Sequence, residues 1–554
     1  MPYAARPRVD QGMRKLGLLL GLGLLPLLGL SSLGLLDYDE AAYGEVARAM
    51  LARGDWLVPQ LCGVAWFEKP PLLYWSAALG MEAFGVGAVG VRLATALAGA
   101  VTPLVLFGFA RRPLGERAAF AAALTLAAAL EFSALARIAF TDMLLLSWLT
   151  LCLGALHRAF EPRAGDVRWL ALGCAAAGLA VLTKGVIGAG FPALALAGEL
   201  ALRGRFRELW RPTWIALALL LVLGIGSSWY LALGLTQPGG FAFMRSLFLE
   251  NHVGRFSRPM QGHGGSLLYY LPVLLVGLFP ASPLLPGAIA RAGLRGDDER
   301  TRFLRLFALF AAIVLAFFSA AATKLPSYAL PAFPGCALLV GAWLTRDSGR
   351  ERALAVSLAV AIALAVLAAL GLVLLPELLA SPAAWSSKAA LHPALAGSLD
   401  LGPGCWIAAA VLAGAAGAAA VAWRRAAAER ALVALCLGAG ATYFVLFLTV
   451  APRVDAQLNA PLRRLAERAA SLTRPDEPVL LLGLRHRPSV CFYGARRTHY
   501  ASEAGGKWTT ERLFGPQHDR IGISGEPQLA RLPDAGRLEI LERDGGYVLF
   551  RIPD

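Results

Sequence analysis

Long stretches of apolar residues alternate with short polar segments along most of the 554-residue chain. A helix needs about 20 mostly apolar residues to cross the hydrocarbon core of a bilayer. Segments of this kind predict about thirteen membrane-spanning helices near residues 15–36, 88–110, 116–134, 139–157, 167–184, 186–202, 212–234, 267–289, 303–322, 327–345, 353–375, 402–423 and 430–450. The apolar segment 71–85 is too short to span, and we interpret it as a re-entrant or interfacial helix.

The pattern changes after residue 452. Charged residues become more frequent, and short runs of β-forming residues lie between turns rich in glycine, proline and aspartate. These runs are 479–482, 490–493, 538–541 and 547–552. We therefore expect an all-α polytopic membrane domain over residues 1–452, followed by a small soluble α/β domain over residues 453–554.

The positions of the basic residues predict how the chain is oriented. Arginine and lysine concentrate in the cytoplasmic loops of membrane proteins. With a cytoplasmic N-terminus, every predicted inner loop is rich in arginine: 111–117, 157–168, 203–211, 291–305, 346–352 and 424–430. An odd number of spans then places the C-terminus on the periplasmic side of a bacterial inner membrane. The predicted α/β domain over residues 453–554 lies on that side as well.

Composition supports this class of protein. The chain is 57% hydrophobic and only 16% charged, as expected for a membrane protein. Much of its net charge of +15 lies in the short inner loops, so we expect no nucleic-acid partner. The seven cysteines show no paired spacing, and we expect neither a metal cage nor a disulfide framework.

The segment 37–74 is unusually polar and aromatic for its place between two apolar blocks. Its first part predicts a helix, because Asp37 and Glu40 form a pair like a capping box and Gly54 follows as a helix stop. Capping explains one acid of this helix, and we interpret Asp37 mainly as the cap. It does not explain four acids next to a membrane, so Asp39 becomes the leading catalytic candidate.

Several motifs of this segment occur together in one known family. Asp39, Glu40, Tyr43, Glu45, Arg48 and Met50 are followed by Asp55, Trp56 and Pro59 and then by Phe67-Glu68-Lys69-Pro70. This pattern resembles membrane glycosyltransferases that use polyprenyl-phosphate sugars, including the aminoarabinose transferases of lipid A and protein O-mannosyltransferase-like relatives. The later motifs keep the family's order to about residue 345, around Arg92, Arg137, Asp142, Lys184, His252, Arg255, Lys324 and Tyr328.

The resemblance implies a GT-C fold and an inverting transfer, with the active site on the periplasmic side. It implies Asp39, Glu40, Lys69 and Asp142 as catalytic residues. The implied substrate-binding residues are Tyr43, Arg48, Arg92, Arg137, Lys184, Arg255, Lys324 and Tyr328. It also suggests that Glu68 and His252 share a divalent metal such as zinc, although two ligands are too few to infer a site from spacing.

Topology points the same way as the resemblance. Ten ionisable residues fall at external span ends or in external loops: Asp39, Glu68, Lys69, Arg92, Arg137, Asp142, Lys184, His252, Arg255 and Lys324. Ionisable groups in membrane segments are costly and default to functional hypotheses. A transporter would place some of them near the bilayer midplane, so gathering on one face favours an enzyme over a lipid-linked sugar flippase.

Each candidate also has a plainer interpretation. Lys69 fits an interfacial anchor beside Trp66 and Phe67, and Asp142 fits an ion pair with Arg137 at a helix start. Glu68 and His252 fit a salt-bridged acid and an ordinary loop histidine. We interpret residues 37–85 and 235–265 as catalytic loops, the second as a mobile lid, with a plain solvated loop as the alternative.

We expect transfer of a sugar from undecaprenyl phosphate to an envelope acceptor. The sugar and acceptor that fit best are 4-amino-4-deoxy-L-arabinose and a lipid A phosphate, which would connect the chain with lipopolysaccharide modification and polymyxin resistance. The alternatives are mannose or galacturonic acid passed to protein or glycan, and a flippase from another class. We expect contacts with membrane lipids, a monomer, and no obligatory cofactor.

Overall fold

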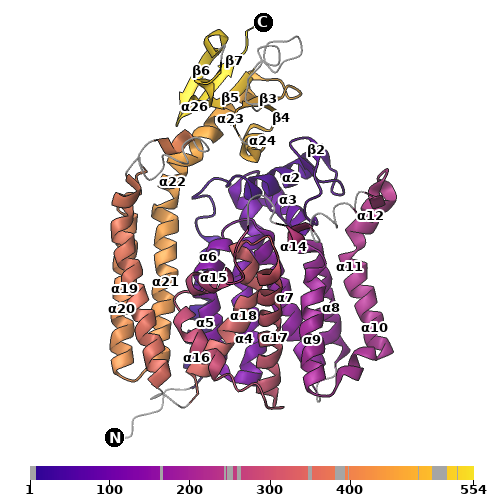
Figure 1. The fold of residues 1–554 in the computed structure, drawn as a ribbon, viewed down its shortest axis with the longest axis vertical. Helices are drawn as coiled ribbons and strands as arrows, with labels where there is room; N and C mark the ends of the chain where they lie inside the picture. The colour runs from indigo at the N-terminus through magenta and orange to yellow at the C-terminus, as the bar shows by residue number, and fades with distance from the viewer. Residues whose placement is uncertain are drawn as a thin grey trace.

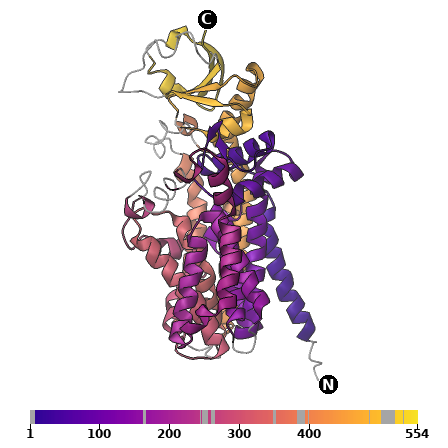
Figure 2. The same cartoon turned by 90° about the vertical axis from the view of Figure 1, so that its right-hand side faces the viewer.

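The computed structural model describes residues 8–161, 166–242, 245, 254–258, 264–346, 352–380, 393–396, 399–484, 486–501, 521–532 and 535–553. A bundle of helices forms the body of the molecule, and a small sheet stands at one end of it (Figure 1). The same arrangement is visible from the side, where the N- and C-terminal ends lie at opposite ends of the long axis (Figure 2).

Seven helices of the described chain are long and apolar enough to cross a membrane. They are α4 (Ala88–Leu114), α8 (Val167–Lys184), α17 (Glu299–Ala320), η6 with α18 (Pro326–Leu344), α19 (Arg352–Ala380), α20 (Gly404–Arg424) and α21 with α22 (Ala428–Leu458). An eighth span results if the pair bent by 55°, Pro212–Gly226 and Ser228–Thr236, crosses as one. The chain is therefore a multi-pass membrane protein, and the count of about thirteen spans stays a prediction.

Further helices complete the bundle. They are α1 (Arg8–Leu24), η1 (Leu25–Leu27), α5 (Glu116–Ala128), α6 (Leu130–Leu135), α7 (Thr141–Ala159), α9 (Ile187–Leu202), η2 (Phe206–Trp210), α10 (Pro212–Ala218), the π-helical turn η3 (Leu219–Leu223), α11 (Gly224–Gly226), α12 (Ser228–Thr236), α14 (Arg255–Ser257), α15 (Tyr270–Gly277), η5 (Ser282–Leu284) and α16 (Leu285–Ala290). The 3₁₀ segments η6 (Pro326–Ala332) and η8 (Pro393–Ala396) and helix α18 (Phe333–Leu344) lie between α17 and α20 in the sequence.

Besides the bent pair in 212–236, other segments that the sequence predicts as single spans are broken. The segment 116–134 divides into α5 and α6, because Ala129 has an extended backbone. The segment 267–289 divides into α15, η5 and α16 around Pro280 and Pro283. Proline has no backbone N–H to donate and its ring clashes with the preceding turn, so a helix ends before it.

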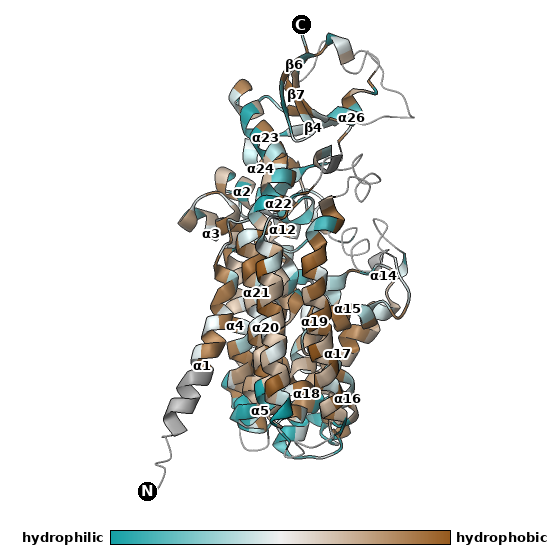
Figure 3. Cartoon of the chain, turned by 90° about the vertical axis from the view of Figure 1, so that its left-hand side faces the viewer, coloured by the Kyte–Doolittle hydropathy of each residue, from teal (hydrophilic) through white to brown (hydrophobic). Residues whose placement is uncertain are grey.

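Ion pairs join the arginine-rich loops at one end of the bundle. Arg112 contacts Glu299 at 3.1 Å, and Arg203 contacts Asp297 at 3.5 Å. Further contacts are Arg117 with Glu429, Arg302 with Glu161, Arg305 with Glu199, and Arg346 with the carbonyl of Arg291. The polar residues of this end and the apolar middle of the bundle are distinct in Figure 3. The loops predicted to share one membrane face therefore lie together.

The polar segment 37–74 lies at the opposite end. It forms α2 (Asp39–Arg53), a hairpin of β1 (Gln60–Leu61) with β2 (Val64–Ala65), and the start of α3 (Leu72–Phe84). The predicted helix stop is confirmed, since Gly54 adopts a left-handed conformation with φ 66°. The short helix expected over 71–85 is also present, and it crosses α4 closely enough that a Cβ on Gly80 would lie 2.2 Å from the Gly90 carbonyl oxygen.

The C-terminal part carries a five-stranded sheet in the order β4-β3-β5-β7-β6. Strand β3 pairs in parallel with β4 and β5, whereas β7 is antiparallel to β5 and β6. The elements are α22 (Ala451–Leu458), α23 (Ala460–Leu472), β3 (Val479–Leu482), α24 (Pro488–Gly494), β4 (Thr498–Ala501), β5 (Ile521–Gly525), α26 (Glu526–Leu529), η9 (Ala535–Arg537), β6 (Glu539–Asp544) and β7 (Tyr547–Arg551).

Two expectations for this part are wrong. The run 490–493 forms most of helix α24 instead of a strand, because its apolar side chains serve two cores. Val490 packs in the core of the sheet, while Phe492 packs in the core of the bundle. The second error concerns the cysteines, since Cys62 forms a disulfide with Cys491 across 429 residues of sequence. No local spacing can reveal a pair that only the fold brings together.

Candidate active site

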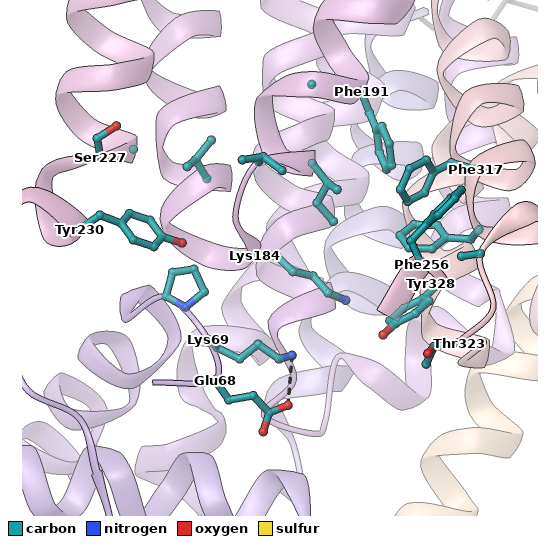
Figure 4. A pocket seen from close by; sticks show the side chains of 18 of the residues that line it. Glu68, Lys69, Lys184, Phe191, Ser227, Tyr230, Phe256, Phe317, Thr323 and Tyr328 are labelled. Carbon is teal, nitrogen blue, oxygen red and sulfur yellow. Dashed lines mark hydrogen bonds and ion pairs between the residues drawn. The ribbon is translucent and has the colours of Figure 1, made fainter. Parts of the chain in front are cut away.

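A cavity of about 750 Å³ opens at the end of the bundle that carries α2 and α3. Its walls come from the segment before α3, from α8 and α9, from α11 and α12, and from the end of α17 with η6. Figure 4 shows the charged side chains of Glu68, Lys69 and Lys184 at one part of this cavity and the phenylalanine rings labelled Phe191, Phe256 and Phe317 at another. The cavity therefore offers one compartment for charge and one for an apolar chain.

Two lysines define the polar part of the cavity. Lys69 Nζ lies 3.4 Å from Glu68 Oε1, and both residues line the cavity (Figure 4). Lys184 Nζ lies 2.5 Å from Asp142 Oδ1 and 4.7 Å from the centre of the Tyr328 ring. Lys184 is the last residue of α8, whereas Lys69 precedes Pro70 and Pro71, whose fixed backbone angles aim the chain into α3.

Aromatic residues form the apolar part. Phe191, Phe256, Phe317 and Phe318 line the cavity, and the Phe191 ring lies 5.2 Å from Phe317 and 5.9 Å from Phe318. Sequence reasoning missed these side chains as site residues. Phenylalanines are frequent in any apolar span, so only the packing of α9 against α17 distinguishes these from residues that face lipid.

Asp39 is the first residue of α2 and is exposed. Tyr43, one turn further along, is buried among Trp66, Tyr74 and Phe140 at ring distances near 6 Å. Burial raises the pKa of the Tyr43 hydroxyl well above its usual value, and the charges of Asp39, Glu68 and Asp142 raise it further. The Tyr43 hydroxyl therefore lies in the electrostatic field of three predicted site carboxylates.

Asp37 does not cap α2, and the predicted capping box is wrong. Tyr38 stands at the cap position with no side-chain bond. The Asp37 carboxylate accepts hydrogen bonds from Ser489 N at 3.0 Å and Ser489 Oγ at 2.5 Å, and Arg487 lies 3.9 Å away. Burial raises the pKa of Asp37, and Arg487 with the Ser489 hydrogen bonds lowers it in part.

Glu40 and Arg92 form a fully buried ion pair. The Arg92 guanidinium donates to both carboxylate oxygens of Glu40, at 2.7 and 2.6 Å. Glu40 also accepts from the backbone N–H groups of Leu36 and Ala139, both at 2.9 Å. Neither residue lines the cavity. This geometry favours a structural role for both residues, since removing one partner of such a pair leaves a buried charge.

Three further predicted binding residues are engaged outside the cavity. Arg48 pairs with Glu45 at 2.7 Å on the same face of α2, as expected from their spacing. Arg137 donates to the carbonyls of Ser133 and Leu25 and lies over Phe447. The alternative pairing of Arg137 with Asp142 is wrong, because Asp142 pairs with Lys184. Lys324 donates to the carbonyls of Phe318, Ser319 and Ala321 at the end of α17.

The remaining predicted residues concern the 235–265 loop and the metal. His252 lies outside the described residues, as do most neighbours in its loop, so the proposed lid and the shared metal stay predictions. Arg255 begins the short helix α14. Within the described ranges, no group of three or more His, Cys, Asp or Glu side chains could hold a metal ion.

The sequence and the fold are both similar to those of known glycosyltransferases. Residues 68–231 match the family model described as dolichyl-phosphate-mannose-protein mannosyltransferase. The fold is that of the crystal structure of ArnT from Cupriavidus metallidurans bound to undecaprenyl phosphate, with a TM-score of 0.81, 24% identity and 99% of each chain covered. The archaeal oligosaccharyltransferase AglB from Archaeoglobus fulgidus is more distant, with a TM-score of 0.50 and 12% identity.

The descriptions of curated relatives name a donor lipid and a sugar. An undecaprenyl phosphate-α-4-amino-4-deoxy-L-arabinose arabinosyl transferase of Edwardsiella ictaluri (strain 93-146) is 34% identical over 326 residues, which cover 58% of this chain and 57% of the relative. A protein of the same description from Pseudomonas aeruginosa (strain LESB58) is 35% identical over 328 residues, or 58% of each chain. The aligned part thus spans under two thirds of these relatives. The predicted resemblance to polyprenyl-phosphate-sugar-dependent GT-C glycosyltransferases is confirmed.

Proposed function

We propose that this protein is an inverting glycosyltransferase that moves a sugar from undecaprenyl phosphate to an acceptor of the bacterial envelope. The observation that carries the proposal is the divided cavity, in which Lys69 and Lys184 lie at the polar part and Phe191, Phe317 and Phe318 line the apolar part. A lipid phosphate has the same division into an anionic head and an apolar chain. The relatives named above act on such a donor by their descriptions.

The reaction breaks the bond between the anomeric carbon and the phosphate oxygen and forms a bond from the anomeric carbon to the acceptor oxygen. Negative charge grows on the departing phosphate, and fixed cations stabilise it. Lys69 and Lys184 supply that charge in our proposal, with Tyr328 as a neutral donor. Asp142 holds the ammonium of Lys184 in place through its 2.5 Å contact.

Asp39 acts on the acceptor in this scheme. An acceptor hydroxyl requires a general base within hydrogen-bond reach, and an exposed carboxylate at the start of α2 suits that role. A phosphate acceptor is already ionised, in which case Asp39 orients the sugar or balances the local positive charge. Replacing Asp39 by Asn removes the charge in both cases, and we expect it to abolish transfer.

We propose 4-amino-4-deoxy-L-arabinose as the sugar and a lipid A phosphate as the acceptor, following the descriptions of the curated relatives. The alternatives within the class are mannose or galacturonic acid transferred to protein or glycan. Mass spectrometry of lipid A tests the assignment, with cells that contain or lack this chain compared under inducing conditions. We expect a mass increment of one aminoarabinose that depends on the chain, and an unchanged lipid A profile would remove this sugar and acceptor.

We propose that the end of the bundle carrying α2, α3 and the C-terminal sheet faces the periplasm, with about thirteen spans below it. The proposed division is a membrane domain over residues 1–452 and a periplasmic domain over residues 453–554. The arginine-rich opposite end supports this orientation. The Cys62–Cys491 disulfide supports it independently, because disulfides persist in oxidising compartments such as the periplasm.

A lipid-linked sugar flippase is the rival from another class. The purified protein in detergent separates the two, because no membrane divides the sample and only an enzyme can move label from the lipid-linked sugar to an acceptor. We expect time-dependent transfer by the wild-type protein and none by Asp39→Asn. Binding of the lipid without transfer to any envelope acceptor would favour the flippase.

A further inference from the structure

The backbone just before Asp39 is held by the C-terminal part of the chain. Gly34 N donates to Asp455 Oδ1 at 2.7 Å, and Leu35 N donates to the Tyr493 hydroxyl at 2.9 Å. Asp37 accepts two hydrogen bonds from Ser489 at the start of α24. Asp37 is only two residues before Asp39, so its attachment fixes where α2 begins.

The same backbone is held from the bundle side by Arg92. Its guanidinium donates to the carbonyl oxygens of Leu30 at 2.8 Å, Leu33 at 2.6 Å and Gly34 at 2.9 Å. The N–H groups of this segment thus point to the C-terminal part and several of its carbonyls point to α4. The fit is close, since a Cβ on Gly34 would lie 2.7 Å from an Arg463 nitrogen.

A second attachment reaches the other site segment. Cys62 lies in the turn between β1 and β2, and its disulfide partner Cys491 lies in α24. The hairpin is closed by a hydrogen bond from Trp66 N to Pro59 O at 2.8 Å. Glu68 and Lys69 follow Trp66 within three residues, so the disulfide anchors the strand pair that leads directly to the cavity.

Helix α24 is suited to serve as an anchor for both segments. Val490 is buried in the core of the sheet, whereas Cys491 and Phe492 are buried in the core of the bundle. The helix packs against both α23 and α2 (Figure 1). A short element buried on both sides cannot shift without opening one of the two cores.

We propose that Asp37 and the Cys62–Cys491 disulfide are positioning residues, which use α24 as a common anchor for Asp39 and for Glu68–Lys69. The inference rests on the proposed function, because it assigns those residues to the acceptor and donor sides of the transfer. It gives the C-terminal part a role in catalysis without contact with substrate. Its chemical consequence is that reducing one disulfide loosens the donor side and leaves the Asp37 attachment intact.

The two attachments predict different kinetic defects. Cys62→Ala with Cys491→Ala should raise the KM for the lipid-linked sugar by about tenfold to a hundredfold with a smaller change in kcat, since misplacement of about 1 Å has effects of this size. Asp37→Asn and Ser489→Ala should instead lower kcat by about tenfold or more with little change in donor KM. Asp544→Asn serves as the matched control, because Asp544 pairs with Arg464 at 2.7 Å in the C-terminal part, away from α24.

Reduction of the purified wild-type protein is a second test of the disulfide. It does not depend on a variant that can fold without the disulfide. Dithiothreitol should reproduce the raised donor KM in the wild type and have no effect on the doubly substituted protein. Affinity for undecaprenyl phosphate, measured without turnover, should fall by the same factor. Alkylation followed by mass spectrometry checks that Cys62 and Cys491 are paired before reduction.

Three results would overturn the inference. These are free thiols at Cys62 and Cys491 in the isolated protein, equal changes in kcat and KM for both sets of variants, and variants whose kinetics and lipid affinity per folded molecule equal those of the wild type. A wild-type protein that binds undecaprenyl phosphate but transfers no sugar overturns the proposed transfer reaction. The lipid-affinity measurement then still decides whether the disulfide positions the donor side.

Discussion

Lys69 and Lys324 have similar sequence contexts, but their ammonium groups have different partners. Lys69 precedes a proline pair and lines the cavity beside Glu68. Lys324 likewise lies just before a proline, in Lys324-Leu325-Pro326. Its ammonium, however, donates to three backbone carbonyls at 2.6 to 3.3 Å. The same side chain thus supplies charge to a cavity in one case and ends a helix in the other. The difference depends on what each ammonium can reach.

At the residue scale, Lys69 carries the clearest prediction. Lys69→Ala removes a cation from the place where the departing phosphate gains charge, so we expect kcat/KM to fall by about a hundredfold or more. The measurement is transfer by purified protein in detergent with a labelled lipid-linked sugar. Arg474→Ala is the control, because the Arg474 side chain is 77% exposed and pairs with Glu477, three residues along the chain in the C-terminal part. Near-normal transfer by Lys69→Ala would contradict the assignment of the donor phosphate.

At the scale of elements, the way a helix ends helps to determine the shape of the cavity. The last carbonyls of a helix have no partner within it. Lys324 satisfies them at the end of α17, and α17 places Phe317 and Phe318 on the cavity wall, with its C-cap residue Ala321 beside them. The end of α17 therefore shapes the cavity, although Lys324 contacts no substrate in our scheme.

Removing the cap on α17 should destabilise the fold locally. Lys324→Met leaves several buried carbonyls without a donor, and we expect a loss of about 1–3 kcal/mol in the free energy of unfolding. The loss should appear as a lower thermal midpoint and as faster amide exchange at the end of α17. Lys324→Arg retains donors and should lie between Lys324→Met and the wild type. If Lys324→Met has wild-type stability and only donor KM rises, Lys324 binds substrate as the sequence suggested.

The whole molecule divides its charges between two ends. Ion pairs of arginine with glutamate or aspartate join the loops at the end opposite the cavity, and the disulfide lies at the cavity end. Both features agree with the arginine-rich end facing the cytoplasm. The long axis of the molecule then crosses the membrane, as the band of apolar residues in Figure 3 suggests.

Labelling of single introduced cysteines tests the orientation of the whole chain. Asp476 and Arg295 are both exposed, and they lie at the sheet end and the arginine-rich end respectively. A membrane-impermeant maleimide should label Asp476→Cys in intact spheroplasts, and it should label Arg295→Cys only after the membrane is permeabilised. The free native cysteines of the described chain are buried, which keeps the background low. The reverse pattern would overturn the proposed topology.

Local chemistry in the sequence determined the helical membrane character, the gathering of arginine-rich loops at one end, and helix α2 with its stop at Gly54. Each depends on residues close together in the chain, through apolar length, charge or backbone angle. Lys69, Lys184 and Tyr328 were identified through the family's motif and not through spacing, and the structure places all three on the cavity.

Only the tertiary structure decided which partner each charged or reactive group has. Arg92 forms an ion pair with Glu40, 52 residues away in the sequence, and Lys184 forms one with Asp142, 42 residues away. Cys62 forms its disulfide with Cys491, 429 residues away. A buried charge or polar group must be paired, but the sequence does not say with which of many distant groups. That choice depends on which helices pack side by side, and it is what places Asp39 and Lys69 at the same end of the bundle.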